Sequence, residues 1–129
     1  MEIFCGTDIV RIDRMEKHLS KEDAFRLRVF TEAELEYCLS HKTDKTKMES
    51  LAARFAAKEA ASKALGTGVM RDGIAWTDFE VRLDELGAPH LEITGRALEI
   101  ANQKGISSWS ISLAHDGDYA ICNCTMLAM

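Results

Sequence analysis

Apolar residues between positions 46 and 65 recur at the spacing of a long amphipathic helix. The residues that share one face, at i, i+3, i+4 and i+7 steps, are Met48, Leu51, Ala52, Phe55, Glu59 and Ser62. Gly66 follows where helices commonly end, so we predict a helix over about 46–65. The shared face should point into the protein, yet Glu59 lies in its middle. A carboxylate in a core must be paired, protonated or bound to a cation, so Glu59 predicts either an ion pair with Lys63, one turn later, or a functional site.

Alternation with a period of two predicts the strands. Residues 3–12 have two faces that are both mostly apolar, as in a strand covered on both sides. Residues 79–85 and 90–94 alternate on either side of the turn LGAP and predict a hairpin. Residues 107–115 alternate again, and the chain then turns at Asp116-Gly117 and returns as a last strand.

Shorter helices are predicted before and between these strands. Residues 13–28 indicate one or two short helices, and Thr31 with Glu34 forms a capping box for a helix over 31–40. Thr94 as cap and Gly105 as stop bound another helix over 94–105. Helices therefore come early and antiparallel strands late, with one strand at the start. This order predicts an α+β fold formed by a single domain over 1–129.

Composition fits this fold and excludes several classes of protein. The chain has 129 residues, of which 47% are apolar, and no apolar run approaches the roughly 18 residues of a membrane span. The N-terminus lacks the basic region of a signal peptide, so we expect a cytoplasmic protein with no membrane partner. A net charge of −5 argues against a nucleic-acid partner. The four cysteines lack paired CxxC spacing, which disfavours zinc and predicts buried free thiols.

Charge is distributed unevenly, with a basic segment near the N-terminus. Residues 11–28 carry six basic and four acidic side chains, although the whole chain is acidic. Such a segment suits docking to an acidic partner. It also fits a solvated helix surface with i,i+4 ion pairs.

Three further features are candidates for chemistry. Asp8 lies on a strand among apolar neighbours, where it either meets Arg11 or the backbone at an irregularity or binds a cation. With Glu59 it would supply the one or two carboxylates that Mg²⁺ usually takes from a protein. The glycine-flanked turn over 66–68 either presents backbone amides to an anion or only ends the helix. His115, at a strand end beside a tight turn, is a general base, a phosphate contact or a turn residue.

Three stretches together resemble the small holo-(acyl-carrier-protein) synthase family of phosphopantetheinyl transferases. They are GTDIVRIDR at the N-terminus, RFAAKEAASKALGTG in the long helix and SISLAHDGDYA near the end, in the family's order and spacing over the full chain. The resemblance implies the phosphopantetheinyl transferase fold. It also implies Mg²⁺-dependent transfer of the phosphopantetheine arm of coenzyme A to a serine of apo acyl carrier protein, with release of adenosine 3′,5′-bisphosphate, in fatty acid biosynthesis. The family is typically a homotrimer with active sites between protomers.

The resemblance further implies roles for individual residues. Asp8 and Glu59 would bind Mg²⁺, Lys63 would contact the diphosphate, and His115 would join the same site across a subunit boundary. The residues along the coenzyme A site would be Arg54, Lys63, Gly66, Thr67, Gly68 and His115, and those facing the carrier protein would be Arg14, Phe25 and Arg28. The serine proton would go to Glu59, directly or through water, with a water at the metal or a His115–Asp116 pair as the other candidate bases.

Two other functions fit part of this pattern. A Mg²⁺-dependent nucleotide phosphohydrolase would use the same carboxylates but would not need the basic segment. A non-catalytic module that binds a carrier protein or a ligand would tolerate loss of Asp8 and Glu59 and would show no metal dependence.

Overall fold

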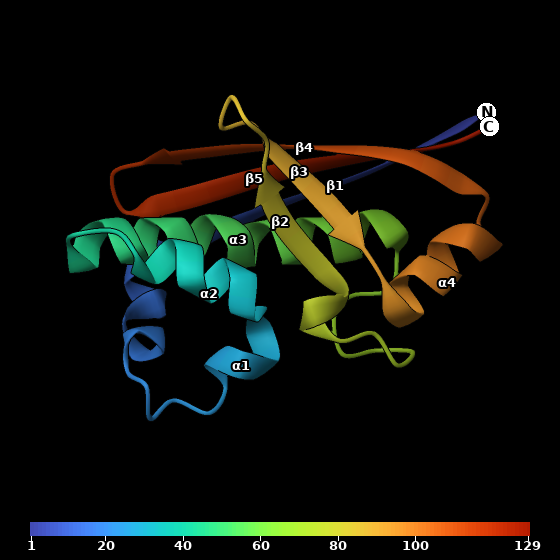
Figure 1. The fold of residues 1–129 in the computed structure, drawn as a ribbon. Helices are drawn as coiled ribbons and strands as arrows, with labels where there is room; N and C mark the ends of the chain where they lie inside the picture. Colours follow the sequence, from blue (N-terminus) through green and yellow to red (C-terminus); the bar gives the residue numbers. More distant parts are fainter.

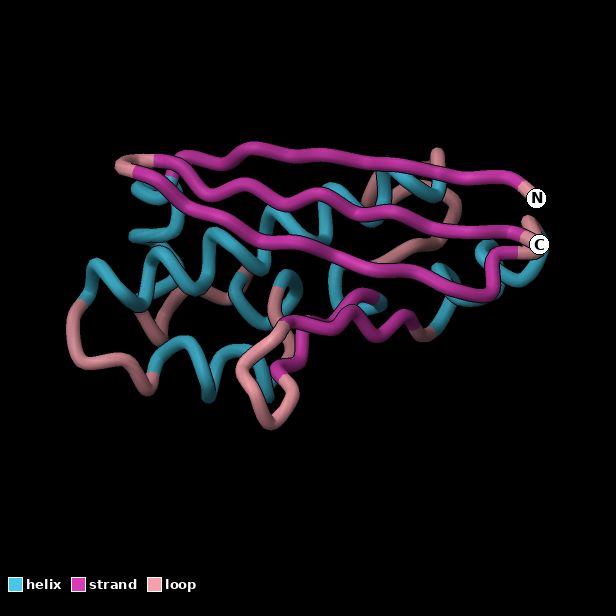
Figure 2. Tube along the Cα trace, turned by 90° about the horizontal axis from the view of Figure 1, so that it is seen from above, coloured by secondary structure: helices cyan, strands magenta, loops and turns pink.

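A three-stranded antiparallel sheet lies across one long helix at the centre of the molecule (Figure 1). The computed structural model describes all of residues 1–129. The strands are β1 (Glu2–Arg11), β4 (Ile106–Asp116) and β5 (Tyr119–Ala128), in the order β1-β5-β4. Figure 2 shows these strands side by side, with both chain termini at the same end of the sheet. The predicted turn at Asp116-Gly117 joins β4 to β5, and Gly117 has the positive φ of 57° that favours glycine there.

Helix α3 (Asp44–Leu65) runs beneath this sheet and packs mainly against β1 and β5. It begins two residues before the predicted start because the hydroxyl of Thr43 accepts a hydrogen bond from the amide of Thr46 and caps the helix. It ends where predicted, at Gly66, whose φ is 84°. No helix of the chain combines the length and the apolar character that crossing a membrane requires.

The helices that follow β1 lie on the side of α3 away from the large sheet (Figure 1). They are the 3₁₀ helix η1 (Ile12–Leu19), the single turn α1 (Arg26–Val29) and α2 (Glu32–Leu39). A second sheet is the hairpin of β2 (Phe79–Leu83) and β3 (Pro89–Ile93), preceded by the 3₁₀ turn η2 (Trp76–Asp78) and followed by α4 (Gly95–Gln103). The predicted α+β order, both hairpins and the early short helices are thus confirmed.

Caps at the helix starts agree with the sequence in one case and differ in another. The capping box of Thr31 and Glu34 is formed at the start of α2. The side chain of Thr94, expected to cap α4, makes no bond to that helix. The carboxylate of Asp78 accepts from the amide of Ala97 at 3.2 Å in its place. Asp78 reaches this amide from η2, so the cap comes from a residue distant in the sequence.

Burial corrects two expectations, one for β1 and one for α3. β1 is covered on one side only: Val10 is buried against α3, whereas Ile3 and Ile9 are 64% and 57% exposed on the outer face of the sheet. α3 is enclosed by the sheet above and by smaller elements below, so residues on almost every side of it are buried from Leu51 onward. Glu59 is therefore not the centre of a buried stripe but a half-buried residue at the helix edge.

The cysteines are free thiols, as predicted, and three of the four are buried. Cys122 and Cys124 lie on the inner face of β5, where burial raises the pKa of each thiol to about 12. Cys5 lies exposed on the outer face.

Candidate active site

An ion pair joins the strand acid to the long helix at the free edge of β1. The Nζ atom of Lys63 donates to Oδ1 of Asp8 at 3.1 Å and to the carbonyl of Thr7 at 3.1 Å. The side chain of Asp8 is 16% exposed. Arg11, the other partner considered for Asp8, pairs with Asp13 at 3.3 Å. β1 pairs with β5 without irregularity through this region, so Asp8 is held on the helix-facing side of a regular strand.

Gly6 allows β1 to approach α3 closely enough for this contact. A Cβ atom at Gly6 would lie 2.0 Å from the carbonyl oxygen of Ala60 and 2.7 Å from the amide nitrogen of Ala64. Only glycine therefore fits between this strand and the helix backbone. Gly6 and Asp8 share one face of the strand, since strand side chains alternate with a period of two. The close contact at Gly6 thus sets how near Asp8 lies to α3.

Glu59 lies one helical turn before Lys63 and is close enough to Asp8 for their charges to interact. Burial raises the pKa of Glu59, the negative charge of Asp8 raises it further, and Lys63 and Arg14 act in the opposite direction. The Glu59–Lys63 ion pair considered from the sequence is not formed, because Lys63 binds Asp8. One of two neighbouring carboxylates thus lacks a cationic partner.

This pair of carboxylates has the chemistry of a site for a hard divalent cation. Both groups offer only oxygen, and Mg²⁺ usually takes one or two carboxylates and leaves its other positions to water and phosphate. The chain contains no group of three or more His, Cys, Asp or Glu side chains that could hold a metal. The unpaired charge of Glu59 beside Asp8 fits an ion shared with a ligand.

The turn after α3 uses its amides within the protein. The amides of Gly66, Thr67 and Gly68 all donate to the carbonyl of Ser62, at 3.1, 3.2 and 3.3 Å. Of the two readings of this turn, the one in which it only ends the helix therefore fits, because these amides bind a carbonyl of the last helical turn and do not point at an anion. Any part that residues 66–68 play in ligand binding depends on their place beside Lys63.

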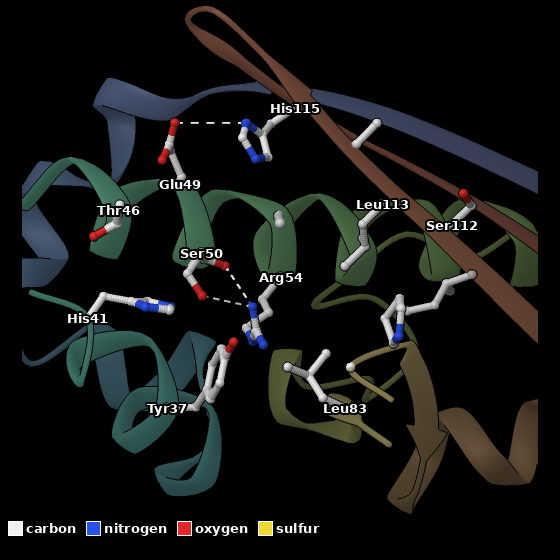
Figure 3. A pocket seen from close by; sticks show the side chains of 15 residues that line it. Tyr37, His41, Thr46, Glu49, Ser50, Arg54, Leu83, Ser112, Leu113 and His115 are labelled. Carbon is white, nitrogen blue, oxygen red and sulfur yellow. Dashed lines mark hydrogen bonds and ion pairs between the residues drawn. The ribbon is translucent and has the colours of Figure 1, made fainter. Parts of the chain in front are cut away.

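A cavity of about 580 Å³ opens on another side of α3, between α2, the β2–β3 hairpin and β4 (Figure 3). Arg54 projects into it from α3, and its Nη1 donates to the hydroxyl and the carbonyl of Ser50, at 2.9 and 3.1 Å. Its guanidinium lies 4.7 Å from the centre of the Tyr37 ring. The side chain is nearly buried and its Nε has no partner. A buried guanidinium with a free donor beside an aromatic ring suits an anionic ligand with a flat group.

His115 lines the same cavity from the end of β4 (Figure 3). Its Nδ1 lies 3.8 Å from a carboxylate oxygen of Glu49 on α3. The predicted His115–Asp116 pair is not formed, because successive residues of a strand point to opposite faces. Glu49 takes the place of Asp116, and nothing in the sequence singled it out.

The two groups of candidate residues lie at opposite edges of the large sheet. β1 carries Asp8 and β4 carries His115, with β5 between them. Because neighbouring strands are about 4.8 Å apart, these edge backbones are separated by roughly 10 Å, with α3 beneath them. One protomer therefore unites Asp8, Glu59 and Lys63 at one edge and joins Arg54 to His115 at the other.

The residues expected to face a partner gather near the first of these edges. The guanidinium of Arg14 lies 5.3 Å from the centre of the Phe55 ring, and that of Arg28 lies 5.3 Å from the Phe25 ring. Phe25 is 60% exposed. A hollow of about 190 Å³ is lined by Arg14, Met15, Lys17, His18, Phe25, Val29, Phe55 and Trp76. Arg14 and Phe25 thus belong to one surface that is both basic and apolar.

One buried charge pair escaped the sequence analysis. Lys58, the neighbour of Glu59, is fully buried and lies 2.7 Å from Glu34 of α2. Lys58 also donates to the carbonyls of Trp76 and Phe79, and Glu34 accepts from the amide of Val81. Burial lowers the pKa of Lys58 and the charge of Glu34 opposes this. The sequence did contain one indication of this pair, because the capping role of Glu34 places a carboxylate at the N-terminus of α2.

Comparisons with known proteins agree with these observations. A holo-(acyl-carrier-protein) synthase from Trichlorobacter lovleyi is 47% identical over 117 residues, which are 90% of each chain, and one from a Geobacter species is 48% identical over the same shares. Among solved structures, the ACPS–CoA complex of Chronobacterium ammoniagenes has a TM-score of 0.82 at 28% identity and covers 100% of this chain and 99% of its own. The synthase of Helicobacter pylori in complex with coenzyme A has a TM-score of 0.77 at 30% identity, with 95% and 99% covered. The family model of the 4'-phosphopantetheinyl transferase superfamily matches residues 4–124, and the chain therefore belongs to that superfamily, as its three motifs predicted.

Proposed function

We propose that this protein is a holo-(acyl-carrier-protein) synthase. It transfers the phosphopantetheine arm of coenzyme A to a serine hydroxyl of an apo acyl carrier protein and releases adenosine 3′,5′-bisphosphate. Synthases that are 47% and 48% identical over 90% of the chain support this activity. The observation that carries the proposal is the cluster of Asp8, Glu59 and Lys63, in which two carboxylates and one lysine meet at the edge of α3.

The reaction requires charge neutralisation more than covalent help from the protein. The serine oxygen attacks the phosphorus that bears the pantetheine arm, and the bond from this phosphorus to the bridging oxygen of the diphosphate breaks. The bisphosphate leaves with the bonding electrons, so negative charge grows on the diphosphate oxygens. Lys63 places its ammonium group against that charge, and its bond to Asp8 at 3.1 Å fixes where the group lies.

Glu59 is the base that accepts the serine proton, directly or through water. A carboxylate with a raised pKa holds a proton more strongly than an ordinary one and is a better base near neutral pH. Asp8 and Glu59 would hold Mg²⁺, which when bound supplies positive charge that neutralises the diphosphate. A site formed by oxygen ligands with one unpaired carboxylate supports this assignment.

Coenzyme A extends between the two groups of residues. Arg54, with its free Nε, and His115 would bind phosphate in the cavity beside Tyr37, and Lys63 with residues 66–68 would lie along the diphosphate. Because Asp8 and His115 lie at opposite edges of one sheet, we assign the two groups that serve one ligand to neighbouring protomers. The exposed outer face of the sheet, with Ile3 and Ile9, supports a homotrimer with active sites between subunits.

The basic surface of Arg14, Phe25 and Arg28 binds the acidic carrier protein close to Glu59. We further propose that the chain works as a single domain over 1–129 in the cytoplasm, in fatty acid biosynthesis, without nucleic-acid or membrane partners. The net charge of −5 supports the absence of a nucleic-acid partner.

An intact-mass assay tests the proposed activity. The protein is incubated with coenzyme A, Mg²⁺ and an apo acyl carrier protein, and the carrier is weighed by mass spectrometry. The expected result is a gain of one phosphopantetheine arm that EDTA abolishes and that Asp8→Asn and Lys63→Met strongly reduce. Nucleotide breakdown without modification of any carrier would identify a phosphohydrolase instead. Carrier binding without either reaction would identify a non-catalytic module.

A further inference from the structure

A buried histidine lies beneath the docking surface and has no part in the proposed transfer. His18 lies in the last turn of the 3₁₀ helix η1, and its side chain is 2% exposed. Its Nδ1 lies 2.6 Å from Oδ2 of Asp23, whose side chain is 18% exposed, in a close contact that is not aligned as a hydrogen bond. On its other side, the His18 ring stands edge-on to the ring of Phe30, with centres 5.4 Å apart. The histidine is thus fixed between a carboxylate and an aromatic ring inside the protein.

The same carboxylate also fixes the backbone that carries Phe25. Oδ1 of Asp23 accepts from the amide of Phe25 at 3.1 Å, and the carbonyl of Asp23 accepts from the amide of Arg26 at 3.3 Å. Arg26 in turn donates to the carbonyl of His18 at 3.5 Å. One oxygen of Asp23 therefore contacts the buried histidine, while the other accepts from the backbone of residues 25–28, the docking segment.

The buried side chains of Val29 and Phe30 anchor the far end of the docking segment, so Asp23 is the contact that fixes its near end, where Phe25 lies. α1 is a single turn of four residues, and a helix this short is not stable by itself. Phe25 and Leu27 are 60% and 62% exposed, so they bury little apolar area. A segment with few buried contacts opens easily. The position of Phe25 therefore depends strongly on Asp23.

We propose that the contact between His18 and Asp23 is a positioning device for recognition of the acidic carrier protein. It joins the loop over 20–25 to η1 and so presents Phe25 and Arg28 at the docking surface. The identity of the partner rests on the proposed function, whereas the fixing of the segment does not. His18 and Asp23 act through Phe25 and Arg28 and are not catalytic residues.

A charge-matched pair of variants separates positioning from electrostatics. Asp23→Ala and Glu22→Ala each remove one negative charge from the same loop, and Glu22 is exposed. If charge alone governed docking, both would bind an acidic carrier more tightly. Asp23→Ala also removes the acceptor of the Phe25 amide, so positioning predicts that it raises the KM for the carrier about tenfold, while Glu22→Ala does not raise it. The KM for coenzyme A and kcat should stay within twofold of the wild type. A carrier KM of Asp23→Ala equal to or below that of Glu22→Ala would overturn the proposal.

Two further variants address each side of the contact. Asp23→Ser keeps a short acceptor for the Phe25 amide but does not reach His18, and His18→Leu keeps an apolar side chain of similar size in the buried position. Both should raise the carrier KM while the protein retains its cooperative thermal unfolding. A carrier KM unchanged in folded His18→Leu would also overturn the proposal.

Hydrogen exchange in the free protein gives a readout that does not depend on transfer activity. The amides of residues 25–30 should lose protection in Asp23→Ala and keep it in Glu22→Ala. Equal protection in the two variants would overturn the positioning role. If the wild type modified no carrier protein, the proposed function would fail, and this measurement would still decide whether the contact holds the segment.

Discussion

Replacing Gly6 with alanine tests whether the close contact between β1 and α3 positions the residues of the candidate active site. Gly6 has an ordinary extended backbone, since it is not among the glycines with positive φ. At such a position the change would normally stabilise the fold by about 0.4–1 kcal/mol, through the unfolded chain. Here the new Cβ would lie 2.0 Å from a backbone oxygen of Ala60, and ordinary contact begins near 3.4 Å. The strand must therefore withdraw by more than 1 Å, and overpacking of this kind costs about 1–3 kcal/mol.

The withdrawal should also reach Asp8, two residues along the same face. A shift of about 1 Å in a positioned group can reduce catalysis by about 10²-fold. We therefore expect Gly6→Ala to lower the melting temperature by several degrees and the rate of carrier modification by at least tenfold, both measured at one protein concentration. Glu85→Ala, a change at an exposed residue in the turn between β2 and β3, is the control and should alter neither strongly. An unchanged or raised melting temperature for Gly6→Ala would refute the reasoning, because the clash would then be absent.

Three other predictions follow from the charges. Lys58→Met should lower the free energy of unfolding in urea by about 3–5 kcal/mol, since it leaves Glu34 buried without its partner, and adding Glu34→Leu should recover part of this loss. A loss below about 1 kcal/mol for Lys58→Met would contradict a buried ion pair. Glu59→Gln should slow transfer at least tenfold yet raise the melting temperature in metal-free buffer at pH 7, because a carboxyl whose pKa is raised in the folded state destabilises the protein as pH rises through that pKa. Calorimetry should find no gain in melting temperature below about pH 4, where the carboxyl is protonated in the folded and the unfolded protein alike. Arg14→Glu and Arg28→Glu should each raise the KM for the carrier and leave the KM for coenzyme A unchanged, and added salt should have the same effect on the wild type. A carrier KM that responds neither to charge reversal nor to salt would exclude these residues from the interface.

Features set by neighbouring residues were predictable from the sequence. The capping box of Thr31 and Glu34, the stop at Gly66 and the turn at Gly117 all lie where expected, because each depends on residues within one turn of the chain. Strand alternation identified both hairpins for the same reason. The sequence also singled out Asp8, Glu59 and Lys63 as candidate residues, since a carboxylate in an apolar pattern is conspicuous and the motifs around them resemble a known family.

Partners and burial were not predictable, because they depend on which element covers which. The helical pattern placed Glu59 in the core and overlooked Lys58, since a helix enclosed on nearly every side has no single apolar stripe to read. The i,i+4 spacing suggested that Lys63 pairs with Glu59, whereas in the fold Lys63 pairs with Asp8, 55 residues away in the sequence. Likewise Asp116 was adjacent to His115 in sequence, but Glu49 faces it across the cavity.

The amino-acid sequence by itself determined the order of helices and strands, the family and a short set of candidate site residues. The tertiary structure alone decided that these residues form two groups at opposite edges of one sheet. The physical reason is that residues close in the sequence determine whether a segment is a helix or a strand and where a helix ends. Which side chains contact one another depends on how distant segments pack. The close approach that Gly6 permits between β1 and α3 sets how near Asp8 lies to Lys63.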